Sequence, residues 1–151
     1  LEHRSPSRII LDKNLKIPLN SRIIKDGKKF RTIIFYNKFD KSKIKQLKKY
    51  QIETFKISLN IDNNLDLHEA LIKAKELGFY RIFLESGKKM TTSFLYENLI
   101  DDLIIFISNR NLLKNGSSNI KKELKTFLSK KEIINEKVNL FGDKLIKYKL
   151  K

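Results

Sequence analysis

Segments with the hydrophobic patterns of strands and helices alternate along the middle of this 151-residue chain. The clearest helix covers residues 67–77, where apolar side chains recur at the spacing of one helical face. Asp66 before it and Gly78 after it are typical of the two ends of a helix. Strand-like segments flank it at residues 53–57 and 80–84. This alternation favours parallel strands joined by right-handed crossovers, and it therefore predicts an α/β domain.

The rest of the chain extends this pattern in both directions. Asp40 or Ser42 is predicted to cap a helix at residues 40–50, and Glu69 is the capping-box partner of Asp66. We predict further extended segments at residues 7–12, 21–25, 32–37 and 102–108. Further helices are predicted at residues 90–99 and 119–129, and a β-hairpin is predicted from the segments 133–140 and 144–150. The sequence thus predicts a mostly parallel central sheet, flanked by helices, with a C-terminal antiparallel β-hairpin.

Composition narrows the class of protein. The length fits one domain, and no apolar run approaches the ~18 residues that span a bilayer. The absence of cysteine excludes disulfides, thiolate metal sites and cysteine nucleophiles, and it fits a cytoplasmic protein. No cluster of side chains has metal-ligand spacing. We therefore expect neither a metal site nor an association with membranes.

The net charge of +16 has two interpretations. Such a charge is typical of proteins that bind nucleic acid. However, lysine outnumbers arginine 27 to 6, whereas nucleic-acid readers favour the planar arginine fork. The joint abundance of isoleucine, asparagine and lysine is what an AT-rich coding sequence produces. We favour this second interpretation, and part of the charge could serve a phosphorylated ligand.

Residues 81–102 form the segment most informative about chemistry. A predicted strand ends in Glu85, a small-residue turn of Ser86 and Gly87 follows, and a helix then begins. Ligands of open parallel sheets bind at the carboxyl ends of strands, and helix N-termini attract anions. The segment could therefore bind a phosphorylated ligand, with Glu85 accepting hydrogen bonds from it. Alternatively, the turn is simple connectivity and Glu85 is a solvated or salt-bridged acid.

Three blocks of sequence resemble one family in the correct order. Residues 83–103 contain F-L-E-S-G, S-F-L and L-I-D-D-L, which are similar to the family's strand, Glu-Gly-Gly, Ser-Phe-Leu and Gly-Leu-Val-Asp-Glu-Leu pattern. Residues 4–22 contain R-S-P, R-I-I-L-D, P-L and S-R, which match its opening run. Gly142 and Asp143 resemble its closing turn. The chain thereby resembles the reductase half of the bifunctional riboflavin-biosynthesis deaminase/reductase family.

This resemblance implies a fold similar to that of dihydrofolate reductase, and it also implies a specific reduction reaction. The family reduces the ribosyl group of 5-amino-6-(5-phosphoribosylamino)uracil to ribityl with hydride from NADPH. Residues 1–151 would then be a reductase domain without its N-terminal portion, with a deaminase domain upstream and a homodimeric assembly. The resemblance places Glu85 at the phosphorylated pyrimidine substrate. It places at NADPH the residues Lys13, Gly87, Lys88, Lys89, Met90, Thr91, Thr92 and Ser93.

The turn departs from the family pattern at several positions. Ser86 and Thr92 replace glycines, and Lys88 and Lys89 replace a Pro-Thr pair. Two alternative functions stay open beside the reductase. One is a catalytically incomplete fragment or remnant that keeps the fold, and the other is a basic nucleic-acid-binding module.

Overall fold

The computed structural model describes residues 5–108, 124, 127–129, 131–134 and 142–151. The chain divides into two compact units, Leu1–Ile82 and Phe83–Lys151, which we describe separately as unit 1 and unit 2. Among the described residues, no helix is long and apolar enough to cross a membrane.

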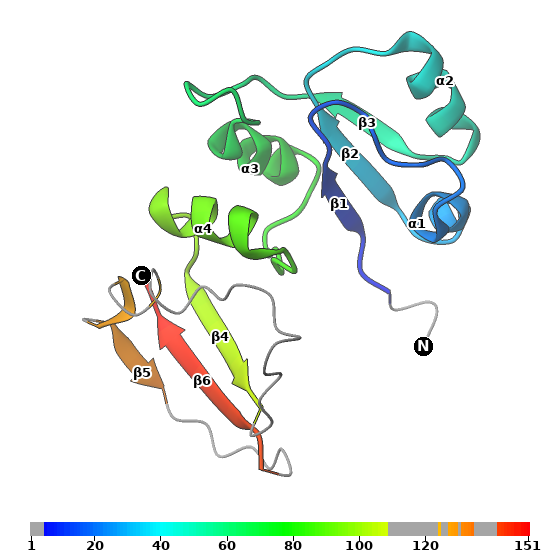
Figure 1. The fold of residues 1–151 in the computed structure, drawn as a ribbon. Helices are drawn as coiled ribbons and strands as arrows, with labels where there is room; N and C mark the ends of the chain where they lie inside the picture. The colour runs from blue at the N-terminus through cyan, green and yellow to red at the C-terminus, as the bar shows by residue number, and fades with distance from the viewer. Residues whose placement is uncertain (1–4, 109–123, 125–126, 130, 135–141) are drawn as a thin grey trace, which may run out of the picture. The chain divides into compact units, whose positions relative to one another are not determined.

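Unit 1 is built on a three-stranded parallel sheet (Figure 1). Its strands are β1 (Arg8–Leu11), β2 (Thr32–Tyr36) and β3 (Glu53–Lys56), in that order across the sheet. All five residues of the central strand β2 are buried. Its sequence T-I-I-F-Y consists of β-branched and aromatic side chains, which favour strands. The predicted extended pieces at 7–12, 32–37 and 53–57 are thus confirmed as parallel strands.

Helices cover both faces of this sheet. They are α1 (Arg22–Lys25), η2 (Asp26–Lys28), α2 (Lys41–Lys49) and α3 (Leu67–Glu76). Ile34 and Tyr36 of β2 pack on one face against a cluster that includes Ile24 and Leu47, from α1 and α2. On the other face, Ile33 and Phe35 pack against Ala70 and Ala74 of α3 in a second core cluster. Alternate residues of β2 therefore supply two separate cores.

Capping at α2 and α3 follows the sequence with one difference. Asp40 accepts a hydrogen bond from the backbone N–H of Lys43 at 2.9 Å, and Asp66 accepts one from Glu69 at 2.9 Å. The predicted capping box is wrong in its second half, because Glu69 accepts from the backbone N–H of Ser58 at 2.8 Å. Glu69 thus fastens the chain leaving β3 to the start of α3.

An ion pair joins the start of β2 to the start of β3. Arg31, directly before β2, contacts Glu53 of β3 through Nε–Oε1 at 2.8 Å and Nη2–Oε2 at 3.3 Å. The same guanidinium lies 5.1 Å from the ring centroid of Phe79. The hydrogen bond to Glu53 raises the pKa of Arg31, so this side chain stays charged.

Two predictions in unit 1 and at its boundary are wrong. Residues 22–25 of the predicted extended piece 21–25 form α1 instead, because Ile24 and Lys25 donate backbone hydrogen bonds to the carbonyl oxygen of Ser21 and Ile24 is fully buried. Residues 80–84 do not form a strand. This β-prone segment spans the division between the units, and Tyr80 and Phe83 are 85% and 77% exposed. A strand needs a ladder partner, which local propensity alone cannot supply.

Unit 2 contains one helix, α4 (Lys88–Tyr96), and an antiparallel sheet among its described elements. The strands β4 (Asp102–Ile107), β5 (Glu132–Ile134) and β6 (Lys144–Lys149) lie in the order β4-β6-β5. Leu95, Leu128 and Leu150 form its buried core. The predicted helix at residues 90–99 corresponds to α4, which begins at Lys88 and ends at Tyr96.

The predicted antiparallel sheet at the C-terminal end of the chain is confirmed, but β4 pairs with a strand that the sequence did not predict as its partner. We expected residues 102–108 to continue a parallel sheet, but β4 pairs antiparallel with β6. The predicted hairpin corresponds to β5 and β6, and its residues 135–141 lie outside the described part of the chain. Most of the predicted helix at 119–129 also lies outside it, although residues 124 and 127–128 are helical.

Asp12 organises the turn that leaves β1. Its two carboxylate oxygens accept hydrogen bonds from the backbone N–H groups of Lys16, at 3.0 Å, and Ile17, at 2.7 Å. Leu15 lies inside this turn with a left-handed φ of 53° and is buried. A leucine in that conformation is strained, so the carboxylate and the buried side chain must hold it there.

We predict that Asp12→Ala lowers the free energy of unfolding by about 1–3 kcal/mol, because two backbone donors lose a charged acceptor. Urea denaturation measures this change. Asp62→Ala is the matched control, since Asp62 is exposed and no described side-chain contact involves its carboxylate. Equal unfolding midpoints for the two variants would contradict this role of Asp12.

We predict that Gly27→Ala destabilises unit 1 by about 1–3 kcal/mol through overpacking. Gly27 is buried, and an added Cβ would overlap the side chain of Ile52 and the carbonyl oxygen of Tyr50. Gly87→Ala is the control, because an added Cβ there meets nothing within 4 Å and φ is −71°. Thermal unfolding that is unchanged by Gly27→Ala would show that this packing is wrong.

Candidate functional site

The carboxyl end of the parallel sheet in unit 1 is held together around Lys13. This residue follows β1, and its carbonyl oxygen accepts hydrogen bonds from the backbone N–H groups of Asn37, at 3.0 Å, and Lys38, at 2.9 Å. Asn37 also donates from its side chain to the carbonyl oxygen of Ile57 at 2.9 Å. The chain segments leaving β1, β2 and β3 are therefore tied to one another at the edge where open sheets bind ligands.

The ammonium group of Lys13 is also held in place. Its Nζ donates to the carbonyl oxygen and to the Oδ1 of Asn63, the latter at 3.0 Å. Asn63 lies in the loop between β3 and α3. Lys13 itself is half-buried.

In unit 2, Glu85 and the residues that follow it lead directly into α4. Glu85 is exposed. The hydroxyls of Ser86 and Thr91 lie 3.0 Å apart, and the Thr91 hydroxyl also approaches the carbonyl oxygen of Ser86 at 3.3 Å. These contacts fasten the turn to the first part of the helix. Ser86, which replaces a family glycine, thus takes part in shaping the turn.

The N-terminus of α4 differs in charge from those of α2 and α3. Its N-cap is Gly87, no side chain caps it, and no acidic residue lies in its first turn. Lys88 and Lys89 occupy that turn, whereas α2 and α3 each have an aspartate cap. Two lysines in the first turn add to the positive end of the helix dipole, which favours an anion there. Gly87 has open space around its Cα, so a ligand can approach the backbone.

The remaining predicted residues lie further along α4. Ser93 donates from its hydroxyl to the carbonyl oxygen of Lys89 at 3.2 Å. Met90 and Thr92 are half-buried. The Thr92 Oγ1 is buried, and it has no hydrogen-bond partner in the part of the chain that the structure describes. Such a group costs free energy until it finds a partner.

The predicted residues thus fall into two groups. Glu85 and residues 87–93 form one continuous structure in unit 2, whereas Lys13 belongs to unit 1. Each group is consistent with anion binding within its own unit.

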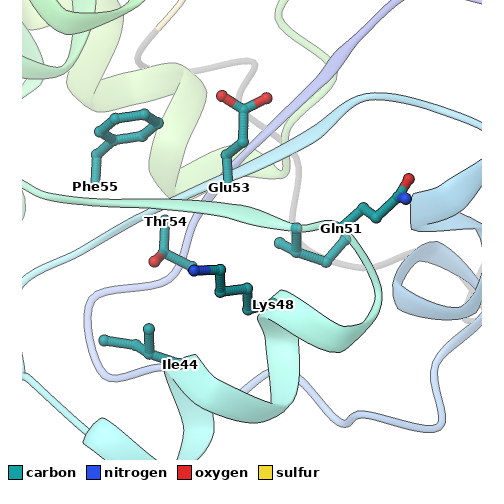
Figure 2. A pocket seen from close by; sticks show the side chains of 7 residues that line it. Ile44, Lys48, Gln51, Glu53, Thr54 and Phe55 are labelled. Atoms are coloured by element: carbon teal, nitrogen blue, oxygen red, sulfur yellow. The ribbon is translucent and has the colours of Figure 1, made fainter.

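A hollow of about 440 Å³ lies elsewhere in unit 1, between α2 and the edge strand β3. Figure 2 shows Glu53 and Phe55 on one side of β3, and Thr54 with Ile44 and Lys48 of α2 on the other. None of the residues predicted for the site lines this hollow. Glu53 is already engaged by Arg31, so the hollow lacks a free carboxylate.

The sequence did not identify two residues that shape the site. Asp12 shows no local signal beyond its place at the end of a strand-like segment, although its carboxylate accepts hydrogen bonds from Lys16 and Ile17 in the turn after Lys13. The local signal at Asn63 is only the turn-forming composition N-I-D-N-N of residues 60–64, which does not predict its contact with Lys13. Across the described residues, no group of three or more His, Cys, Asp or Glu could hold a metal ion.

Comparison with curated proteins relates the chain to riboflavin biosynthesis. It is 28% identical over 144 residues to the riboflavin biosynthesis protein RibD of Aquifex aeolicus, covering 91% of this chain and 38% of that protein. It is 25% identical over 103 residues to the 2,5-diamino-6-ribosylamino-4(3H)-pyrimidinone 5′-phosphate reductase of Archaeoglobus fulgidus, covering 68% and 44%. The chain therefore spans less than half the length of these relatives.

Solved structures share the fold. RibD of Acinetobacter baumannii matches with a TM-score of 0.65 and 17% identity, over 95% of this chain and 37% of that one. A pyrimidine reductase-like protein of Corynebacterium diphtheriae matches with a TM-score of 0.70 and 15% identity, over 95% and 60%. The family model for the RibD C-terminal domain matches residues 1–112, about three quarters of the sequence. The chain accordingly belongs to the RibD C-terminal domain family, whose fold is that of dihydrofolate reductase.

Proposed function

We propose that this chain is part of a reductase domain that converts the ribosyl group of 5-amino-6-(5-phosphoribosylamino)uracil to ribityl, with NADPH as the reductant. Family membership supports the reaction class, because members act as pyrimidine reductases of riboflavin biosynthesis. The observation in this chain that carries the proposal is the start of α4, where a glycine cap, two lysines and no acid follow Glu85.

The residues around α4 fit the diphosphate of a dinucleotide. The first backbone N–H groups of a helix have no acceptor within the helix, and they point towards a ligand at its N-terminus. The open space at Gly87 gives a diphosphate access to these groups. Lys88 and Lys89 add positive charge, and the Ser86–Thr91 contact keeps the turn in one conformation.

We assign Glu85 to the binding of the pyrimidine substrate. It immediately precedes the turn, so a side chain there lies next to a cofactor held by α4. A carboxylate accepts hydrogen bonds from ring N–H and amino groups. Its role would be to orient the substrate, while NADPH supplies the hydride.

The larger protein context is also part of the proposal. We infer a cytoplasmic homodimer in which residues 1–151 belong to a reductase domain, with a deaminase domain upstream in the full-length protein. The curated RibD relatives are much longer than this chain, which supports a second domain.

We predict that NADPH binds saturably and more tightly than NADH, with affinity that survives moderate salt. Gly87→Ala should weaken NADPH binding by about tenfold, because the methyl group blocks close approach to the backbone. Titration of nicotinamide fluorescence measures both effects, and unfolding experiments check that the variant keeps its stability.

Three results would contradict the proposal in different ways. Absence of binding to either dinucleotide would favour a remnant of the fold. Binding that disappears at moderate salt without preference between dinucleotides, together with salt-sensitive affinity for DNA or RNA, would favour the basic nucleic-acid-binding module. Equal NADPH affinity of the wild type and Gly87→Ala would remove α4 from the cofactor site.

We predict that Glu85→Gln keeps NADPH affinity and lowers kcat/KM for the pyrimidine substrate by roughly 10- to 100-fold, because a charge-assisted hydrogen bond is lost. Steady-state NADPH oxidation gives kcat/KM. Glu97→Gln is the control, because Glu97 is a carboxylate at the other end of α4. Unchanged turnover in Glu85→Gln would disprove the substrate role.

A further inference from the structure

The hollow beside α2 lies along the free edge of β3. Among the described residues β3 is the last strand of the parallel sheet, so one side of its backbone faces no other strand. The lining includes Thr54, on the side of α2, and Phe55, on the other side of the strand (Figure 2). Because side chains from both faces of β3 line it, the hollow contains the strand edge itself. Its volume of about 440 Å³ is typical of ligand-binding clefts.

The register of β3 determines which of its backbone groups face this edge. Ile57, directly after the strand, donates its backbone N–H to the carbonyl oxygen of Tyr36 in β2 at 2.7 Å. In a parallel pair, alternate residues direct both their N–H and their C=O to the same neighbouring strand, so Phe55 also bonds to β2. Thr54 and Lys56 therefore direct their backbone N–H and C=O groups away from β2, towards the free edge.

The outward N–H groups on either side of these two residues already have acceptors within the chain. Ile52 donates to the carbonyl oxygen of Leu47 at 3.3 Å. Ser58 donates to the carboxylate of Glu69 at 2.8 Å. The open part of the edge is therefore short and has a defined beginning and end. An exposed strand edge is a template for an added strand, and this one has room for a short strand only.

Positive charge surrounds the hollow. Helix α2 has the sequence K-S-K-I-K-Q-L-K-K, which contains no acidic residue. Lys48 lines the hollow, and Lys56 is exposed and lies on the same face of β3 as Thr54. Among the ion pairs between described residues, none includes either lysine. Glu53, the only carboxylate in the lining, is paired with Arg31. The charges therefore favour a partner that carries carboxylates.

Apolar side chains form the rest of the lining and restrict the partner further. Ile44, Ile52 and Phe55 contribute to it, so the hollow can also accept apolar side chains of an added strand. A second copy of this chain does not match the surface. Its own β3 would bring Lys56 and the lysines of α2 close to their equivalents, and like charges across a strand pair are destabilising.

We propose that the free edge of β3 binds a short extended segment of a partner protein as an added strand, and that this segment alternates acidic with apolar residues. The acidic side chains face Lys48 and Lys56, the apolar side chains face Phe55, and the backbone pairs with Thr54 and Lys56. This interaction surface lies within unit 1 and does not rest on the proposed function.

The test uses a short peptide of alternating glutamate and valine, blocked at both ends, and a lysine–valine peptide of the same length. Lys48→Glu reverses a charge inside the hollow. Lys49→Glu is the matched control, because Lys49 is the next residue of the same helix, is exposed and does not line the hollow. Thr54→Pro removes one outward N–H at a strand edge, where proline is tolerated. Calorimetry measures affinity, and NMR hydrogen exchange follows single backbone amides.

We expect the wild type and Lys49→Glu to bind the glutamate–valine peptide alike, with an affinity that falls as salt rises. Lys48→Glu should weaken this binding by about three- to tenfold and should bind the lysine–valine peptide better than the wild type does, because the charge is reversed. Thr54→Pro should abolish binding. In the wild type, the peptide should slow hydrogen exchange at the amides of Thr54 and Lys56 and leave Phe55 unchanged, since that amide already bonds to β2.

Several results would overturn the inference. One is the absence of peptide binding by the folded wild type, and another is binding that is equal in the wild type and Lys48→Glu. A third is binding that leaves exchange at Thr54 and Lys56 unchanged. Protection of these two amides without peptide, rising with protein concentration, would instead show that a second copy pairs with β3. None of these results depends on NADPH binding, which tests the proposed function separately.

Discussion

The burial of β2 on both faces is the constraint on which unit 1 depends. Each of its five side chains is removed from water, and alternate residues enter two different cores. Burial of such side chains contributes about 1.5–3 kcal/mol each. Because β2 is central and parallel to both neighbours, the carboxyl ends of three strands meet at one edge. Lys13 and Asn37 follow two of these strands, so their contact at this edge is a direct consequence of how the core is buried.

In unit 2, the candidate binding residues are positioned by the packing of α4. The start of α4 is anchored by the burial of Phe94 and Leu95 on its inner face, which leaves Gly87, Lys88 and Lys89 exposed at its N-terminus. The Ser86–Thr91 contact then stabilises the turn from Glu85 into the helix. The core of this unit therefore fixes the direction of the helix, and the helix presents its uncapped end for binding.

Much of the fold could be predicted from local patterns. The strand at 32–37 and the helix at 67–77 were recognisable because their hydrophobic periods and caps agree with their tertiary environment. Residues 80–84 were not, since their strand-like composition needs a partner strand that propensity does not reveal. The capping box predicted at Asp66 and Glu69 is incomplete for a similar reason. The carboxylate of Glu69 accepts a hydrogen bond from the backbone N–H of Ser58, which lies outside the local motif. Asn63 could not be predicted at all, because its link to Lys13 depends on how the sheet brings two distant loops together.

The proposed reaction of this chain is the reduction of a phosphoribosylamino-pyrimidine by NADPH. The most direct measurement is to incubate the protein with NADPH and 5-amino-6-(5-phosphoribosylamino)uracil and to analyse the product by mass spectrometry. We predict a product that is heavier by two hydrogens and carries a ribityl chain, formed in step with NADPH oxidation. Binding of NADPH with no conversion of this substrate would contradict the claim.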